Sequence, residues 1–307
     1  MAFARAPGYN NLPNGAFSPV IYSKKIIKAF RKASVVDDIT NTDFAGEITN
    51  FGDTVAIIRE PDVTVAAYVR GQQLTSQTLD DDSISMVVDK ANQFQFAVDD
   101  IEKKHSHVNF QELATSRAAY KLVDTYDSDI LTYMEGQVAS AMMYGSRATS
   151  AGLIDLGFDS GEVSPLDAMN RLKRFMDEAN MPQDNRWIVA DPYFWELMGD
   201  EDSKLLSHDY TNSGENLLRN GKVTDGQIRG FKCYMSNNVP TSTVQGATYR
   251  VLLAGHKSAV CTANQIAKTE SFRSQNSFSD VVRGLHLYGR KAIRTTDGLA
   301  ACYFKID

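Results

Sequence analysis

The segment DDIEKKHSHVNF, residues 99–110, gathers the side chains of this sequence that could bind a metal ion. His105 and His107 lie two residues apart, on the same side of an extended chain, and Asp99 or Asp100 could add oxygen ligands. Such a site would be that of a metal-dependent hydrolase. The spacing matches no strong zinc pattern, however, and both histidines precede a predicted helix start. We therefore favour a solvated joint between two elements and keep the metal site as the alternative.

Two other groups could also do chemistry. Asp124, Asp127 and Asp129 lie close together, and the first two share a helical face, which could hold a divalent ion but is more typical of a polar face that is solvated or contacts another subunit. Cys261 and His256 could be a thiol and its base, but on a helix their side chains would diverge. The sequence has no GxxxxGK[ST], GxGxxG or GxSxG motif. We expect no enzyme, no catalytic residue, no bound metal and no cofactor.

Composition narrows the class of protein. The 307 residues can bury a substantial core, and the net charge of -6 leaves no broad basic field for wrapping nucleic acid. Cys233, Cys261 and Cys302 form no CxxC pair, which indicates free thiols in a reducing compartment. No apolar run approaches the roughly 20 residues that span a bilayer. A cytoplasmic protein, neither secreted nor embedded in a membrane, is expected.

The first hundred residues are predicted to form an arm, a short helix and a hairpin. The opening residues are rich in Gly, Asn, Ala and Pro and should lie extended on another surface. Ser18 and Pro19 begin a short amphipathic helix at 18–32. Four β-branched or alternating runs predict strands, at 53–58, 63–70, 83–88 and 93–98. We interpret 53–98 as a long β-hairpin arm whose polar tip, 71–83, is solvated.

A long helix should follow the joint. Asn109 and Glu112 form a capping box, and no helix breaker comes before Gly136. The helix could extend to about Tyr144, a rod of roughly 50 Å. Its predicted apolar stripe consists of Leu113, Tyr120, Val123, Ile130, Met134, Val138 and Met142.

The second half of the sequence reads as a compact α/β region. Ser164 and Pro165 begin an amphipathic helix that Pro182 ends. Further elements are expected as a strand at 186–192, a short helix at 193–199, a strand at 227–240 and a strand at 248–255. The closing residues 279–306 alternate strongly around a TTDG turn, which predicts two long strands paired with each other.

This α+β order, with four stretches of matching sequence, resembles the major capsid proteins of tailed bacteriophages, which have the HK97-type shell fold. The stretches are FGDTVAI at 51–57, FAVDDIEKKHSHVNFQELATSRAAYKLVDTYDSDI at 96–130, GFKCYMSNNVP at 230–240 and FSDVVRGLHLYGRKAIR at 278–294. They are similar to the family's hairpin start, joint and spine helix, central strand and turn, and closing strands.

The resemblance implies a division into domains. Residues 1–50 would be the N-terminal arm, 51–98 the extended loop, 99–150 the peripheral domain with its spine helix, 151–262 the axial domain, and 263–307 the C-terminal strands of the peripheral domain.

The resemblance also implies a function. The chain would be a major capsid protein that self-assembles, as hexamers and pentamers, into an icosahedral shell enclosing the phage genome. Its implied partners are other copies of itself, a separate scaffolding protein, a portal protein, in some shells a decoration protein, and packaged double-stranded DNA contacted non-specifically, with no membrane. Its place would be the virion capsid, assembled in the bacterial host cytoplasm. The alternatives are an encapsulin-like nanocompartment shell and, from another class, the metal-dependent hydrolase using Asp99, Asp100, His105 and His107.

Overall fold

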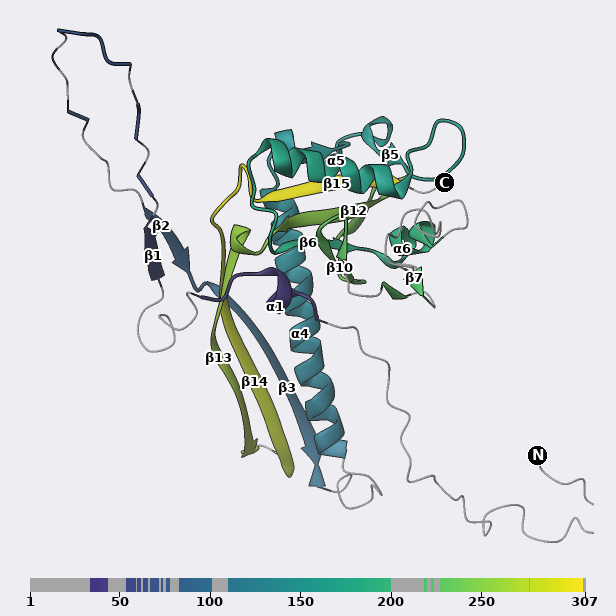
Figure 1. Ribbon diagram of the computed structural model, residues 1–307. Helices are drawn as coiled ribbons and strands as arrows, with labels where there is room; N and C mark the ends of the chain where they lie inside the picture. Colours follow the sequence, from purple (N-terminus) through teal and green to yellow (C-terminus); the bar gives the residue numbers. More distant parts are fainter. Residues whose placement is uncertain are drawn as a thin grey trace, which may run out of the picture.

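The computed structural model combines one long helix, a three-stranded sheet, a larger mixed sheet and a projecting hairpin (Figure 1). The residues that the structure describes are 34–43, 54–58, 60–61, 63–65, 67–71, 73, 76–77, 83–100, 110–199, 218–219, 222–223, 227–275 and 277–305. Residues 1–33 of the predicted arm, with the amphipathic helix expected at 18–32, and the capping residue Asn109 lie outside them. No helix among the described residues is long and apolar enough to cross a membrane.

The long helix α4, Phe110–Gln137, has 28 residues, which at roughly 1.5 Å per residue gives a rod of about 42 Å. The prediction that it reaches Tyr144 was wrong. After Gln137 the chain turns through a 3-10 helix, Ser140–Met142, into the short strand β4, Met143–Tyr144, which pairs in parallel with the last strand of the chain. Strand pairing with a distant segment therefore overrides the helical pattern at this end.

Burial of α4 increases toward its C-terminal end. Ile130 and Met134 are buried as predicted, and so are Val138 and Met142 beyond the helix. Val123, expected in the stripe, is instead 45% exposed. Tyr126 and Leu131, which the predicted stripe missed, are buried with Ile130 in the main core. The first half of the helix thus has an apolar side that its own chain only partly covers.

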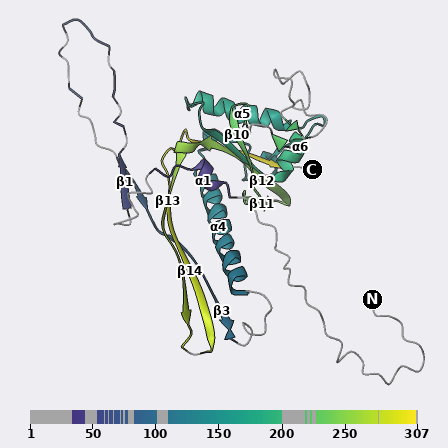
Figure 2. The same cartoon turned by 60° about the horizontal axis from the view of Figure 1, so that its bottom comes forward.

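One face of the three-stranded sheet carries α4 (Figure 1 and Figure 2). The strands are β13, Val260–Arg273, β14, Ser279–Ala292, and β3, Lys90–Asp99, in the antiparallel order β13-β14-β3. The Tyr288 hydroxyl of β14 donates to the Asp129 carboxylate of α4 over 2.9 Å. Side chains of Tyr288 and its alternate neighbours on β14 therefore point toward the helix.

The hairpin differs from its prediction. Strand β1, Thr54–Ile58, pairs with β2, Ser83–Val87, but β3 leaves the hairpin and pairs with β14 along its whole length. The predicted strand at 63–70 is absent among the described residues there. The arm is therefore a two-stranded stem with a long loop, and the interpretation of 53–98 as one hairpin was wrong. The alternation of β3 was read correctly, but its partner lies nearly 200 residues away.

The stem of the hairpin packs on the rest of the chain. Ile57 and Met86 join Val88, Cys261 and Ala263 in a second small core, separate from the main one. The hairpin is thus anchored at its base by β13, while its loop projects away from the body (Figure 1).

The larger sheet holds most of the core. Its order is β4-β15-β12-β6-β10-β9, with β11 beside β12 and β5 beside β15. Every residue of β6 is buried, as are most of β12 and β15, because helices α5 and α6 and the end of α4 pack with them in one core. The bounds are β5 Ile154–Asp155, α5 Pro165–Glu178, β6 Arg186–Ala190, α6 Pro192–Met198, β9 Gln227–Ile228, β10 Phe231–Met235, β11 Thr241–Val244, β12 Ala247–His256 and β15 Leu299–Lys305.

Local signals place the helices of this region well. Ser164 accepts a hydrogen bond from the Asp167 amide over 3.2 Å, with Pro165 in the first turn, as predicted for α5. Asp191 caps α6 in the same way. The minor elements are α1, Val36–Ile39, the pair β7, Leu218–Arg219, and β8, Lys222–Val223, and the 3-10 helices Ser150–Gly152 and Lys257–Ala259.

The two C-terminal strands do not pair with each other, which corrects the prediction for 279–306. Strand β14 pairs with β13 and β3, whereas β15 pairs with β12 in the larger sheet. The turn at 295–298 therefore connects two sheets rather than two neighbouring strands. Strand β13, which the sequence patterns did not single out, is the true partner of β14.

Candidate assembly interface

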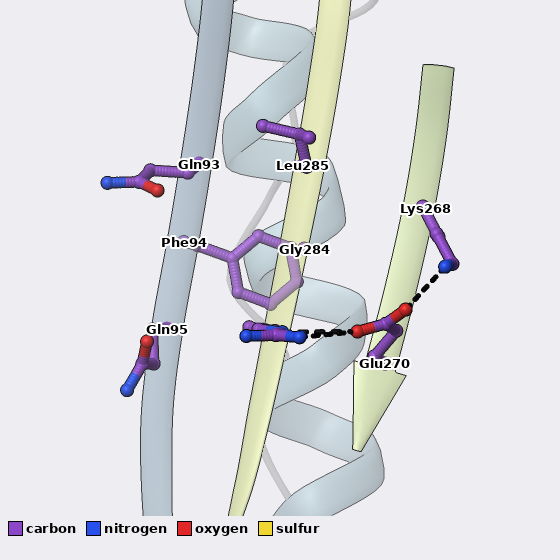
Figure 3. Close-up of a pocket in the computed structure, with 8 residues that line it drawn as sticks. Gln93, Phe94, Gln95, Lys268, Glu270, Gly284 and Leu285 are labelled. Carbon is purple, nitrogen blue, oxygen red and sulfur yellow. Dashed lines mark hydrogen bonds and ion pairs between the residues drawn. The ribbon is translucent and has the colours of Figure 1, made fainter. Parts of the chain in front are cut away.

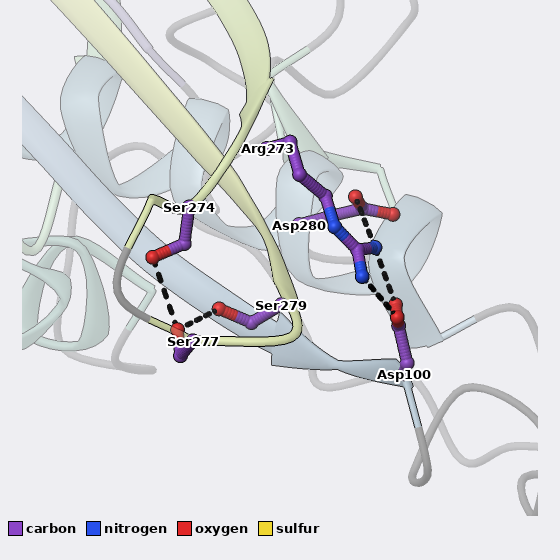
Figure 4. A network of polar contacts seen from close by, with 6 residues as sticks. All are labelled: Asp100, Arg273, Ser274, Ser277, Ser279 and Asp280. Atoms are coloured by element: carbon purple, nitrogen blue, oxygen red, sulfur yellow. Dashed lines mark hydrogen bonds and ion pairs between the residues drawn. The ribbon is translucent and has the colours of Figure 1, made fainter.

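At the joint, where a metal site was the alternative interpretation, the described carboxylates have other places and partners in the structure. Asp99 is the last residue of β3, and Asp100 forms a two-pronged ion pair with Arg273, one prong being 2.7 Å long (Figure 4). His105 and His107 lie outside the described residues. Within the described ranges no group of three or more His, Cys, Asp or Glu side chains is placed to hold a metal ion. The Asp100 carboxylate thus ties the joint to the tip of β13.

This ion pair closes the far end of the three-stranded sheet. Arg273 also reaches Asp280 over 3.3 Å, and its hydrogen bonds to Asp100 raise the pKa of the guanidinium. Beside it, Ser277 bridges Ser274 and Ser279 through hydroxyl contacts of 3.0 and 2.7 Å (Figure 4). The β13–β14 turn is therefore held in shape by polar contacts, while Phe278 on the turn is 82% exposed.

The three aspartates of α4 point to three separate partners rather than to one ion. Asp124 accepts from the amide of Asn238 over 3.0 Å and pairs with Lys121 over 3.2 Å. Asp129 accepts from Tyr288 and forms a 2.6 Å ion pair with Arg290. These contacts belong to the chain itself.

Asp127 corrects the expectation of a solvated or intersubunit carboxylate. It is only 1% exposed, and its oxygens accept hydrogen bonds from the Ser34 hydroxyl and the Val35 amide. Burial raises its pKa to about 6. The expectation failed because its partners lie more than 90 residues away in the sequence.

The structure also places the possible thiol nucleophile, Cys261, and its possible base, His256, in different sheets. Cys261 is buried in the small core at the foot of the hairpin, and burial raises the pKa of its thiol to about 12. His256 lies in the other sheet, where its ring nitrogen Nδ1 contacts the Ser258 hydroxyl at 2.7 Å. A buried neutral thiol is a poor nucleophile, so these two residues are structural.

A shallow groove of about 510 Å³ crosses the outer face of the three-stranded sheet (Figure 3). The ring of His286 lies 5.4 Å from that of Tyr126 on α4, so His286 faces the helix. Because side chains alternate along β14, Arg283 and Leu285 point away from the helix. The side chains along this face are those of Gln93, Gln95, Lys268, Glu270, Arg283 and Leu285. Polar and apolar groups are mixed here, as on surfaces that contact another protein.

Both cations of this groove pair with its one carboxylate. Glu270 accepts hydrogen bonds from Lys268 over 2.5 Å and from Arg283 over 2.8 Å, and these two cations lower its pKa to about 2. Beside them, Phe272 and Leu285 are each about two-fifths exposed. The groove therefore offers flat apolar contact area with fixed charges, and not a free acid or base for catalysis.

The loop of the hairpin is the most exposed apolar part of the described chain. Val65 is 91% exposed, Val63, Tyr68 and Val69 are also open to solvent, and Ile58 at the end of β1 is 77% exposed. The Thr64 amide donates to Gln77 over 3.1 Å across the loop. The acidic run at 80–82 lies outside the described residues. Apolar side chains clustered on a projecting loop mark a protein contact surface.

No family model and no curated protein matches the sequence, but solved structures do. A structure titled Mycobacterium phage Che8 superposes with a TM-score of 0.72 at 24% identity, covering 94% of this chain and 97% of that one. The capsid of the cyanophage P-SCSP1u gives 0.69 at 17% identity, covering 95% and 93%. The mature capsid of bacteriophage PhiM1 gives 0.68 at 15% identity, covering 99% of both chains. The chain has the fold of phage capsid proteins.

The phage capsid fold extends over almost the whole chain, so α4, both sheets and the hairpin all belong to it. It is a mixed α+β fold, as predicted. What the sequence patterns did not reveal is the outer groove, because its residues come from three strands that meet only in the folded sheet. The valines of the hairpin loop are evident in the sequence, but their β-branched side chains predict a strand and not an exposed loop.

Proposed function

We propose that this protein is the major capsid protein of a tailed bacteriophage and that it self-assembles into an icosahedral shell enclosing the phage genome. The observation that carries the proposal is the likeness to phage capsid structures over nearly the full length of both chains. Neither the joint carboxylates nor Cys261 supports catalysis, since Asp100 is paired with Arg273 and the thiol is buried. A shell subunit needs large contact surfaces and no active site.

The hairpin is the element that we propose joins neighbouring subunits. A two-stranded arm is marginally stable alone, and in this one Val63, Val65 and Val69 are exposed among the residues that the structure describes. Interfaces in permanent assemblies bury on the order of 2,000 to 5,000 Å², much of it apolar. The outer face of the β13-β14-β3 sheet of a second copy offers a matching surface with exposed Phe272 and Leu285.

The domain division implied by the resemblance is part of the proposal. Residues 1–50 would be the arm, 51–98 the extended loop, 99–150 and 263–307 the peripheral domain, and 151–262 the axial domain. The structure adds that β15, Leu299–Lys305, lies in the larger sheet with β12. Within this scheme α4 is the spine of the peripheral domain.

The proposed partners follow from a shell of this kind. Copies of the chain would form hexamers and pentamers, with a separate scaffolding protein, a portal protein, in some shells a decoration protein, and non-specific contact with packaged double-stranded DNA. Assembly would take place in the bacterial host cytoplasm and the product would be the virion capsid.

Substitution in the hairpin loop tests this function. Val65→Asp should leave the subunit folded, because the side chain is 91% exposed, but should prevent or weaken shell formation by placing a charge in an apolar contact. Electron microscopy would count shells and circular dichroism would check the fold. Glu60→Gln, at another exposed loop position, is the matched control and should assemble normally. Normal shells from Val65→Asp would contradict the proposed role of the loop.

A further inference from the structure

Asp127 on α4 holds the chain segment that leads into α1. Its Oδ1 accepts a hydrogen bond from the Ser34 hydroxyl over 2.9 Å, and its Oδ2 accepts one from the Val35 amide over 3.3 Å. Val35 is the N-cap residue of α1 but supplies no side-chain cap of its own. The carboxylate from α4 therefore satisfies the amide of the N-cap residue itself, as the acidic partner does in a capping box.

The other end of the same segment is fixed by groups that do not titrate. The Asn41 amide donates to the Val260 carbonyl over 2.9 Å, and the Thr262 amide donates to the Asn41 carbonyl over 3.0 Å. The hydroxyls of Thr40 and Thr262 meet at 3.0 Å, both buried. The segment thus has a non-titrating attachment to β13 at 40–41, apolar burial of Val35 and Val36 in the main core, and one polar attachment at 34–35 that depends on a single carboxylate.

The charges around this carboxylate do not favour its ionised form. Burial raises the pKa of Asp127 from 3.8 to about 6, and the nearby carboxylates of Asp37 on α1 and Asp124 on α4 add to the rise. The hydrogen bonds from Ser34 and Val35 act in the opposite direction but do not offset it. Lys121, on the same helix, is paired with Asp124.

The sheet below adds aromatic groups without a compensating positive charge at neutral pH. Tyr126, next to Asp127, packs edge-on against His286 and Tyr288 of β14. Burial lowers the pKa of His286, so its ring is neutral at pH 7, and burial raises the pKa of the Tyr126 hydroxyl to about 12. Arg290, on the same strand, pairs with Asp129, two residues beyond Asp127 on α4.

We propose that protonation of Asp127 controls how firmly the segment beginning at Ser34 docks on α4, and we call this contact the clasp. When protonated, Asp127 can donate to the Ser34 hydroxyl through one oxygen and accept from the Val35 amide through the other, so the segment stays docked on α4. When ionised it places an unbalanced charge in the core, and the segment from Ser34 onward loosens while the attachment at 40–41 holds. Solution pH would therefore set how firmly residues 34–36 are docked on α4.

The direction and size of the pH effect on docking follow from the difference in the pKa of Asp127 between the docked and released states. A carboxylate that titrates near 3.8 when released and near 6 when docked makes docking weaken as pH rises between these values and level off above about 6. From pH 5 to pH 7 the docking equilibrium constant should fall by about tenfold. His286, with its lowered pKa, acts in the opposite direction on acidification, so the comparison must be made against a variant that changes Asp127 alone.

Hydrogen exchange of the full, unassembled chain tests the clasp without reference to shell formation. Exchange of the peptide covering 34–41 would be followed by mass spectrometry at pH 5, 6 and 7 and divided by the intrinsic rate. We expect the opening constant of the wild type to rise about tenfold from pH 5 to 7. Asp127→Asn, which is neutral and nearly isosteric, should show a flat, protected profile.

Two further variants keep the test decisive. Asp124→Asn removes a neighbouring carboxylate on the same helix and should retain most of the pH dependence. Ser34→Ala removes one hydrogen bond to the ionised form but keeps the carboxylate, so its pH dependence should persist even if Asp127→Asn does not fold. An identical pH profile in Asp127→Asn and wild type, or loss of the profile in Asp124→Asn, would overturn the proposal.

Discussion

The three aspartates of α4 show how neighbouring residues of one type take different roles. Asp129 meets Arg290 and Asp124 meets Lys121, whereas Asp127 is buried with hydroxyl and amide donors only. Their spacing could not distinguish these roles, because the distant partners, Asn238 for Asp124, Ser34 for Asp127 and Arg290 for Asp129, come from different parts of the chain. Burial, and not sequence density, identifies the aspartate whose ionisation matters.

Gly284 provides a residue-scale prediction. A Cβ atom built there would lie 2.2 Å from the ring of Phe94, its direct partner on β3, so any larger residue would force the ring to shift. Gly284→Ala should destabilise the subunit by about 1–3 kcal/mol, as overpacking does. The matched change Gly136→Ala, on α4 with no atom near its Cβ, should instead stabilise by roughly 0.5–1 kcal/mol. Chemical denaturation measures the change in unfolding free energy of each variant. An equal change in the two variants would show that Phe94 can move aside.

Among the helices and strands, the sequence predicted the positions of elements that depend on neighbouring residues. It did not predict which strands pair when they are distant in the sequence. Helix α5 with its Ser164 cap, strand β6 and helix α6 were expected within a few residues of their bounds. Strand β3 was recognised by its alternation, but alternation specifies a face and not a partner. The same limit explains β14 and β15, which are adjacent in sequence and lie in different sheets.

The candidate interface divides in the same way. The exposed apolar loop could be anticipated, since a protruding hairpin has no core of its own. The groove on the outer face could not, because Glu270 and Arg283 become neighbours only through the antiparallel register of β13 and β14.

Shortening the hairpin tests its role as an element. Replacing residues 59–82 by Asn-Gly would join Ile58 to Ser83, which are already paired, through a two-residue turn. The subunit should fold with near-native thermal stability, because Ile57 and Met86 at the base remain packed. Shells should be absent or fragile in high salt. Unfolding of this variant would show that the loop contributes to its own subunit's core.

At the scale of the whole molecule, the chain stabilises its centre and leaves its extremities open. The larger sheet and the end of α4 share one buried core, while the hairpin loop, Phe278 on the β13–β14 turn and Val123 on α4 are exposed. The hairpin lies far from the β13–β14 turn in the structure (Figure 1). Several distinct contact surfaces on one subunit are what a closed assembly of many copies requires.

The most direct test of this account is electron microscopy of the full chain after expression, with particles reconstructed to a resolution that traces the backbone. We expect closed icosahedral shells in which the hairpin of each subunit lies on the outer face of the β13-β14-β3 sheet of a neighbour. A protein that stays monomeric at high concentration, or shells in which every hairpin points into solvent, would contradict the proposed function and its interface.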